Sequence, residues 1–226
     1  MSEKETMRKK SFINEMPMFI LLLIPFAVIA FLWNDLPEQV PIHWNMENEA
    51  DIYADKFPGL FLIPFLNFGI YFLFLGIPRI DPRWKDFHLF NKTFYWLRFG
   101  IVLFMVIVWS MSILSVYGID LNVGLLIIIT ITTIFLGIGI IMPKIKQNPY
   151  LGIRVPWTLK DKENWEKSHK FGGKVWVTGS LLMYAISFFL DMPVLLYIFI
   201  ILVLMIIITP IIYSYRLHKN KQQVNI

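Results

Sequence analysis

The 226-residue chain contains no cysteine and only four histidines. The absence of cysteine excludes disulfide bonds, thiolate metal sites and a lipoprotein anchor. The histidines at positions 43, 88, 169 and 218 lie far apart in the sequence and follow no metal-ligand spacing. We therefore expect neither a bound metal nor a cofactor.

Charged residues are missing from six long stretches of the chain, which contain no Asp, Glu, Lys or Arg. Each stretch approaches or exceeds the ~20 residues that an α-helix needs to cross ~30 Å of hydrocarbon. Hydrophobic residues make up 57% of the sequence, which is too apolar for an ordinary soluble domain of this length. The predicted transmembrane helices are residues 16–33, 57–78, 99–119, 121–143, 175–190 and 192–215.

Basic residues concentrate on one side of this predicted arrangement. Twenty of the 21 Lys and Arg residues lie at the two termini or in the second and fourth connections, and Lys56 is the exception. Short loops rich in Lys and Arg stay in the cytoplasm. We predict an all-α polytopic integral membrane protein with six transmembrane helices and both termini cytoplasmic. This asymmetry also explains the net charge of +5, so we expect no direct contact with nucleic acid.

The predicted helices group into three consecutive pairs. Gly118 and Asp120 leave room only for a tight turn between the third and fourth helices, with Asp120 capping the fourth. Asp191 plays the same part between the fifth and sixth, so each of these pairs should be antiparallel and adjacent. The predicted divisions are residues 1–78 with an acidic extracellular loop at 34–57, residues 79–143, and residues 144–226 with a long inner loop.

The predicted spans lack the residues that catalysis or ion coupling requires. Ion-coupled transporters usually place a charged residue or histidine near the middle of the membrane, and none is present here. A nucleophile–base pair and a zinc-protease motif are also missing from the spans. We predict that the protein is not an enzyme. A membrane-surface enzyme that uses Asp161, Glu163 and His169 is an alternative, but it has neither a nucleophile nor a metal cluster.

The outer loop has two prolines, Pro37 and Pro41, which favour an extended or polyproline conformation. Its six acidic residues and Lys56 give a net charge of −5. The sequence is compatible with an ordered cap on the helices and with a surface that meets a cationic ligand. The residues that we assign to an outward-facing site are Pro41, His43, Trp44, Asn45 and Asp51.

The inner loop predicts a short helix lying on the membrane. Thr158 and Asp161 match a capping pattern, which starts a helix over about residues 159–170 with Trp165 and His169 on one face. Aromatic residues on such a helix would hold it along the membrane surface, while its lysines meet lipid phosphates.

The ends of the inner loop carry turn signals. Asn148-Pro149 and Gly172-Gly173 are expected to separate it from the neighbouring spans. Arg154 lies among apolar residues and should bind a backbone carbonyl, a carboxylate or a phosphate. Anchoring to lipid and docking of a cytoplasmic partner both explain the loop.

The segment Gly-Ile-Arg-Val-Pro-Trp-Thr-Leu-Lys at 152–160, followed by Trp165, resembles the signature of the SdpI family of bacterial immunity proteins. The outer stretch at 36–56 resembles a small domain of unknown function often found at the N-terminus of such proteins. Asn48 stands where that domain usually has glycine. Asparagine tolerates the left-handed conformation better than most residues, so we expect the turn to survive.

The resemblance implies a multi-pass protein of the bacterial cell membrane that protects its cell against a secreted SdpC-like killing peptide. It also implies a possible receptor role, in which an ArsR-type repressor is recruited to the membrane. A small channel, transporter or lipid-binding protein without an immunity role is the alternative. By resemblance, the inner partner-binding residues are Asn148, Pro149, Gly152, Arg154, Pro156, Trp157, Thr158, Trp165 and His169, and the toxin faces the outer residues named above.

Overall fold

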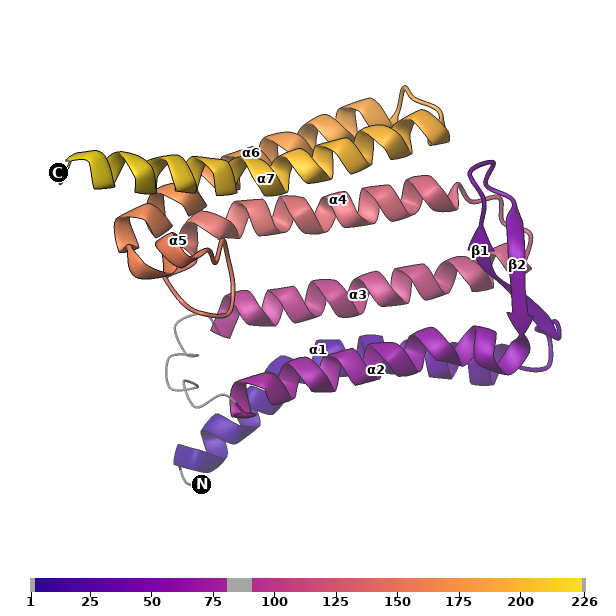
Figure 1. Ribbon diagram of the computed structural model, residues 1–226. Coiled ribbons are helices and arrows are strands. Elements are labelled where there is room, and N and C mark those ends of the chain that lie inside the picture. The colour runs from indigo at the N-terminus through magenta and orange to yellow at the C-terminus, as the bar shows by residue number, and fades with distance from the viewer. Residues whose placement is uncertain (1–2, 81–90, 225–226) are drawn as a thin grey trace. The chain divides into compact units, whose positions relative to one another are not determined.

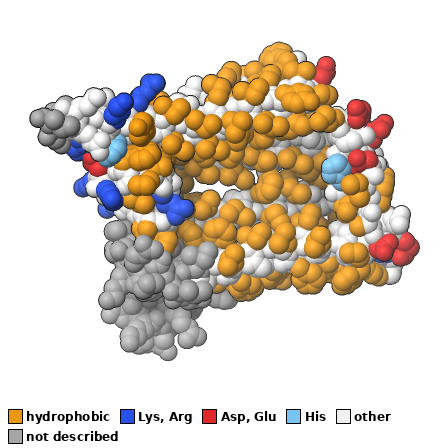
Figure 2. Space-filling view, in the orientation of Figure 1, with side chains coloured by type: hydrophobic (Ala, Val, Ile, Leu, Met, Phe, Trp, Pro, Cys, Tyr) orange, Lys and Arg blue, Asp and Glu red, His pale blue; other side chains and the backbone are white. Residues whose placement is uncertain are grey.

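The computed structural model describes residues 3–80 and 91–224, with side chains described over 15–76 and 94–223, and it is mostly helical (Figure 1). Five helices in this part of the chain are long and apolar enough to cross a membrane, which confirms five of the predicted spans by length and composition. They are α1 (Glu3–Leu32), α2 (Lys56–Ile80), α3 (Asn91–Val116), α4 (Val123–Ile141) and α7 (Met192–Val224). In Figure 2, hydrophobic side chains cover most of the visible face between the charged groups at its two ends.

The chain forms two compact units. The first contains residues 1–81 and 96–123, and the second contains residues 82–95 and 124–226. The third and fourth predicted spans fall in different units, so their pairing stays a prediction, as does the division into three helix pairs.

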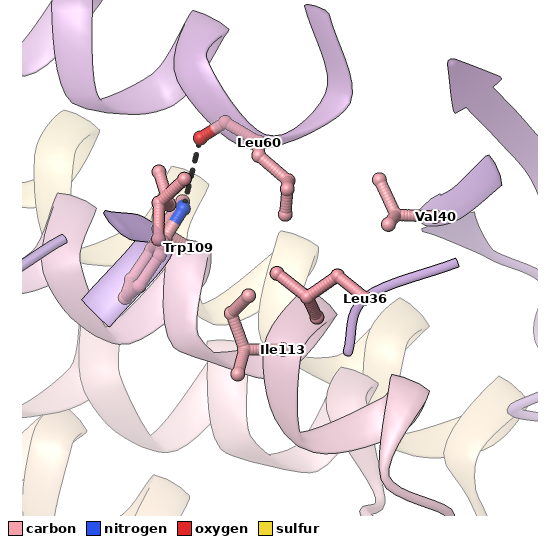
Figure 3. Close-up of a cluster of buried hydrophobic side chains, with 6 residues drawn as sticks. Leu36, Val40, Leu60, Trp109 and Ile113 are labelled. Carbon is pink, nitrogen blue, oxygen red and sulfur yellow. Dashed lines mark hydrogen bonds between the residues drawn. The ribbon is translucent and has the colours of Figure 1, made fainter. Parts of the chain in front are cut away.

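The core of the first unit joins α1, α2 and α3 to the outer loop. Its centre contains Leu36, Val40 and Leu60, which contact Trp109 and Ile113 of α3 (Figure 3). The Trp109 indole Nε1 donates a hydrogen bond to the backbone oxygen of Leu60 at 3.0 Å. This bond gives the one polar atom of a buried indole a partner inside an apolar cluster.

The outer loop folds as a β-hairpin, so the all-α prediction is incomplete. Strand β1 (Gln39–Trp44) pairs antiparallel with β2 (Ala50–Asp55), with Gln39 opposite Asp55. A two-stranded sheet consists of edges, where a proline such as Pro41 is tolerated, and the register is irregular between Pro41 and Trp44. The prolines were expected to favour an extended or polyproline backbone, and β1 is extended, but the sequence analysis did not predict its pairing with β2, in which Pro41 lies opposite Tyr53.

The turn of the hairpin depends on Asn48, which has φ of 65°. Its side-chain Nδ2 donates to the backbone oxygen of Leu121 at 2.6 Å, and its Oδ1 accepts from the backbone nitrogen of Val123 at 2.7 Å. The prediction that asparagine sustains a left-handed turn here is confirmed. The predicted Asp120 cap is wrong, because α4 begins at Val123 and the amide of Val123 binds Asn48 instead.

The second unit contains α4, the short helix η2 (Met142–Lys144), α5 (Pro156–Lys160), α6 (Lys162–Ser187) and α7. Helices α6 and α7 are adjacent and antiparallel, as the short connection at Asp191 predicted (Figure 1). Their shared core contains Met183, Leu195, Leu202 and Ile206, with Ile128 of α4.

The predicted turn at Gly172-Gly173 is wrong, because α6 runs without interruption from Lys162 to Ser187. Both glycines are buried. A Cβ added at Gly173 would lie 2.8 Å from the backbone oxygen of Gly139 and from Pro143, so a larger residue would prevent this close approach of α6. Tertiary packing therefore offsets the ~1 kcal/mol by which each glycine weakens a helix relative to alanine.

The predicted start of the inner helix is also wrong. Two helices replace it, and Asp161, not Thr158, is the N-cap of α6, since its carboxylate accepts from the backbone nitrogens of Glu163 and Asn164 at 2.9 and 3.2 Å. The charged first half of α6 and its apolar second half form one helix, which is not among the five candidate spans. A sixth crossing over residues 175–190 stays a prediction.

Candidate functional site

The inner segment, residues 144–173, begins with a loop organised by Asn148. The side-chain Oδ1 of this buried residue accepts from the backbone nitrogens of Tyr150 and Leu151, both at 2.8 Å. Its Nδ2 donates to the backbone oxygens of Lys146 and Leu151 at 2.7 and 3.2 Å. Four bonds from one amide replace the backbone pairing that a loop lacks, so Asn148 is a structural residue of this segment.

Gly152 and His169 meet at the centre of the inner segment. Gly152 has φ of +113°, and an added Cβ would overlap the imidazole Nε2 of His169. That nitrogen accepts a hydrogen bond from the backbone nitrogen of Ile153 at 3.0 Å, so the proton of the neutral ring lies on Nδ1. Nδ1 then donates to the backbone oxygen of Trp165 at 2.8 Å. The imidazole joins the loop to α6 through both nitrogens.

Trp165 and His169 share one face of α6, as predicted, and their rings stack at 4.0 Å between centroids. Both side chains are buried, and the Trp165 indole Nε1 donates to the backbone oxygen of Ile145 at 2.8 Å. The predicted role of these rings in holding a helix on the membrane surface is therefore wrong. Both rings face the loop at the beginning of the inner segment, and this face of α6 covers that loop.

Thr158 is fully buried and holds the turn before α5. Its hydroxyl Oγ1 donates to the backbone oxygen of Ile153 at 2.6 Å and accepts from the backbone nitrogen of Val155 at 3.1 Å. Gln147 donates to the backbone oxygen of Thr158 at 2.8 Å. Thr158 therefore supports the fold of the inner segment and is not reachable by a partner.

Five of the nine predicted inner residues are at least partly exposed, namely Pro149, Gly152, Arg154, Pro156 and Trp157. The exposed Arg154 donates from Nη1 to the backbone oxygen of Pro149 at 2.6 Å, which confirms the predicted bond to a carbonyl. The Trp157 indole Nε1 donates to the hydroxyl of Ser214 on α7 at 2.9 Å, and its ring stacks on His218 at 5.9 Å. Pro156 and Trp157 line a pocket of about 440 Å³ with residues from the C-terminal part of α7.

The C-terminal part of α7 is tied to the start of α6 by Lys221. Its ammonium lies 2.8 Å from the Asp161 carboxylate and 3.3 Å from that of Glu163. The hydrogen bond from Lys221 holds the pKa of Asp161 below its usual value. Sixty residues separate these partners, so no local pattern could predict the contact.

The residues of the enzyme alternative do not converge on one centre. Asp161 and Glu163 are both paired with lysines, while both ring nitrogens of His169 bind backbone groups. Within the described residues, no group of three His, Cys, Asp or Glu side chains is arranged to hold a metal ion. The geometry therefore gives no support to acid–base or metal chemistry by these residues.

We expect the inner segment to lose stability below about pH 6.5. Burial lowers the pKa of His169, so the folded protein keeps the ring neutral while the unfolded chain takes up a proton near pH 6.5. The stabilisation is complete above that pH and declines as the pH falls toward the folded pKa. Hydrogen exchange of the Ile153 amide should therefore be faster at pH 5.5 than at pH 7.5, after correction for intrinsic exchange.

The matched control for this pH experiment is His218→Gln, which removes a half-buried imidazole on α7. This variant should keep the pH dependence of the wild type, whereas His169→Gln should show weaker protection with a flat profile. An unchanged profile in His169→Gln would assign the effect to another group.

On the outer side, the hairpin brings His43 and Asp51 together. The imidazole Nδ1 lies 2.6 Å from the carboxylate Oδ1, and both side chains are exposed. The Asn45 side chain accepts from the backbone nitrogen of Glu49 at 2.9 Å, and Trp44 is half-buried. Pro41 is buried, so of the five predicted residues it is the one that cannot offer its side chain to a partner.

Lys56, the one lysine or arginine of residues 34–57, points into the fold. Its ammonium donates to the backbone oxygen of Leu36 at 2.6 Å and lies 4.7 Å from the centre of the Trp33 ring. Only 8% of the residue is exposed. The exposed surface of the hairpin therefore presents acidic side chains without a lysine or arginine, as Figure 2 shows on its visible face.

A buried ionic cluster in the first unit was missed by the sequence analysis. The Arg98 guanidinium binds Glu15 with Nη2 and Nη1 at 2.7 and 3.2 Å, and the Tyr71 hydroxyl donates to the same carboxylate at 2.9 Å. Arg98 is 6% exposed, although its sequence position suggested a cytoplasmic connection. The only sign of this cluster in the sequence was an arginine at the edge of an apolar run. The other members, Glu15 and Tyr71, lie on α1 and α2.

These features define a multi-pass cell-membrane protein with an ordered inner segment between its last helices. Residues 144–214 match the SdpI/YfhL protein family, and residues 20–68 match a domain of unknown function (DUF1648). The resemblance predicted from the sequence is confirmed. The chain is 29% identical to Immunity protein SdpI of Bacillus subtilis (strain 168) over 202 residues. The aligned part makes up 89% of this chain and 94% of that protein. No solved structure matches the chain.

Proposed function

We propose that this chain is an immunity protein of the cell membrane that protects its cell against a secreted SdpC-like killing peptide. The observation that carries the proposal is the similarity to Immunity protein SdpI over 94% of that protein's length. Because the match spans most of both chains, it includes the outer hairpin as well as the inner segment. The proposed activity is binding, without a catalytic step.

The hairpin supports a peptide partner that is cationic and partly apolar. Exposed acidic residues surround it, and Lys56 is buried. Four large apolar side chains of the hairpin are also 44–53% exposed, namely Ile42, Met46, Ile52 and Tyr53. A negative surface with apolar patches attracts a basic amphipathic peptide and then offers it apolar contacts. We assign His43, Trp44, Asn45 and Asp51 to this surface, with Pro41 as its support.

The inner segment supports a second, cytoplasmic partner. We propose that it docks an ArsR-type repressor through Arg154 and Trp157 without touching nucleic acid itself. A guanidinium has five N–H donors, and the bond to Pro149 orients the exposed Arg154. The buried Asn148, Thr158, Trp165 and His169, together with Gly152 at its positive φ, would act by holding this surface in shape.

We propose six crossings with both termini cytoplasmic, an arrangement that puts the hairpin outside the cell and the inner segment inside it. The apolar second half of α6 packs on the middle of the α7 span, where Gly179 lies against Ile206 and Leu202. A helix that packs on the membrane-spanning part of its neighbour lies at the same depth, so residues 175–190 would supply the sixth crossing.

The absence of cysteine allows a clean topology experiment with single-cysteine variants. Glu47→Cys should react with a membrane-impermeant maleimide in intact cells. Lys160→Cys and Gln223→Cys should react only after the cells are opened. Labelling of Lys160→Cys in intact cells would contradict the proposed orientation.

The function is tested by survival of toxin-sensitive cells that express the chain and are challenged with purified SdpC-type peptide. The wild type should protect, compared with an empty vector. Replacing Asp51 and Glu49 by their amides should weaken protection, because both carboxylates are exposed on the hairpin. No protection by an inserted wild-type protein would favour the alternative of a channel, transporter or lipid-binding protein, which flux assays in liposomes would then test.

The repressor proposal has its own variant. Arg154→Ala should abolish recruitment of the repressor to membranes while insertion stays normal. Lys146→Ala removes another exposed cation of the same segment and serves as the control. Normal recruitment by Arg154→Ala would remove this residue from the docking surface.

A further inference from the structure

An open groove of about 500 Å³ runs along the α6–α7 pair, away from the inner and outer sites. Its walls include Leu182, Ile201 and Met205, which are 53–61% exposed. Thr178 and Gly179 are small residues of the same lining, and they leave room between the larger aliphatic side chains. Lys174 is the only charged residue among those that line the groove.

The position of Lys174 along the helix pair is fixed by its neighbours. Phe171 stacks on Tyr213 at 4.2 Å, and Gly172 lies against Pro210. Arg216 follows Tyr213 by less than one helical turn, so the cationic end of the groove is near the basic end of the α7 span. From Lys174 to Leu182 the helix rises about 12 Å, which is comparable to one leaflet of hydrocarbon.

The charge at this end has no partner of opposite sign in the described part of the second unit. Lys174 is exposed, and no carboxylate within the described residues pairs with it. A long lysine side chain at this depth extends its ammonium toward the headgroup region. The groove thus combines an apolar slot as long as a leaflet with one cation at the height of lipid phosphates.

We propose that the groove binds one anionic glycerophospholipid of the inner leaflet, with an acyl chain between α6 and α7 and its phosphate on Lys174. Lipid tails surround the helices everywhere, so the apolar slot alone gives no preference over bulk lipid. The headgroup must therefore supply the selectivity, because the ammonium attracts a headgroup of net negative charge, whereas the choline cation of phosphatidylcholine offsets the charge of the same phosphate. The site rests on insertion of the second half of α6 and does not depend on a toxin.

The experiment is native mass spectrometry of the purified full chain in mild detergent with added phosphatidylglycerol or phosphatidylcholine. The wild type should retain one phosphatidylglycerol, with about tenfold higher occupancy than phosphatidylcholine. Lys174→Gln should remove most of this preference. Thr178→Trp, which fills the slot without changing its charge, should lower the binding of both lipids.

The matched control is Lys170→Gln, one turn away on the same helix and exposed but outside the groove. It should leave phosphatidylglycerol binding unchanged. Equal losses in Lys170→Gln and Lys174→Gln would indicate diffuse attraction and overturn the site, as would full binding by Lys174→Gln or equal retention of both lipids. Circular dichroism checks each variant, and Lys174→Gln decides the outcome if Thr178→Trp misfolds. Because no toxin is added, failure here leaves the immunity proposal untouched.

Discussion

Gly152→Ala is expected to destabilise the inner segment by about 2–6 kcal/mol. A non-glycine residue at φ of +113° costs about 1–3 kcal/mol, and the added Cβ also overlaps the Nε2 atom of His169. Relief of that overlap separates the imidazole from the Ile153 amide, which adds the cost of an unpaired buried group, about 1–3 kcal/mol. The change is measured as the free energy of unfolding in mixed micelles and as trypsin cleavage after Arg154.

The control for Gly152→Ala is Gly137→Ala in α4 of the same unit. An added Cβ at Gly137 meets nothing within 4 Å, and helical alanine is favoured over glycine by up to about 1 kcal/mol. This variant should be neutral or slightly more stable. Equal stability of Gly152→Ala and the wild type would show that the contact between the loop and His169 is not needed.

A double variant separates the two causes of this loss, which are the overlap with His169 and the strained backbone at position 152. Gly152→Ala combined with His169→Ala removes the overlap but keeps the strained backbone. The destabilisation of the double variant should therefore be smaller than the sum of the destabilisations of the two single variants, because the two residues are in contact. Full additivity would contradict the close approach of Gly152 to the imidazole.

Arg98→Leu is expected to destabilise the first unit by about 3–5 kcal/mol, since it leaves the Glu15 carboxylate without its cation. The guanidinium is 6% exposed and the carboxylate 18%, so solvent screens the pair little. The Tyr71 hydroxyl would remain as a partner of the carboxylate but carries no charge to balance it. Denaturant titration of the purified protein, followed by circular dichroism, measures the loss.

The double variant Glu15→Leu/Arg98→Leu should recover most of this loss, because it removes both buried charges together. The exposed pair Lys162–Glu166, at 3.9 Å, provides the control, and Lys162→Leu should cause no measurable change. If the double variant is no more stable than Arg98→Leu, the charge of Glu15 is not what makes the single change costly.

Features with a local cause could be predicted from the sequence. Long uncharged runs predicted six spans, five of which are helices of spanning length in the described residues, and the short connection at Asp191 predicted the α6–α7 pair. Asn48 in a left-handed turn and Arg154 on a carbonyl also follow from the residue type and its immediate neighbours. The signature at 152–160 predicted the family match for the same reason, since it is a contiguous string.

Features with a distant cause could not be predicted. Gly172-Gly173 is a turn signal by itself, and only the approach of Gly139 and Pro143 makes it part of a helix. Trp165 suggests a membrane anchor when the sequence is considered alone. In the folded protein its indole Nε1 donates a hydrogen bond to the backbone oxygen of Ile145.

Local sequence was enough to identify segments that are apolar enough to enter a membrane, because hydrophobic length acts one segment at a time. The tertiary structure decided which polar groups are buried and with whom. Glu15, Tyr71 and Arg98 come from three helices, and His169 meets a loop sixteen residues before it. Such partners are chosen by packing in three dimensions, which no short window of sequence contains.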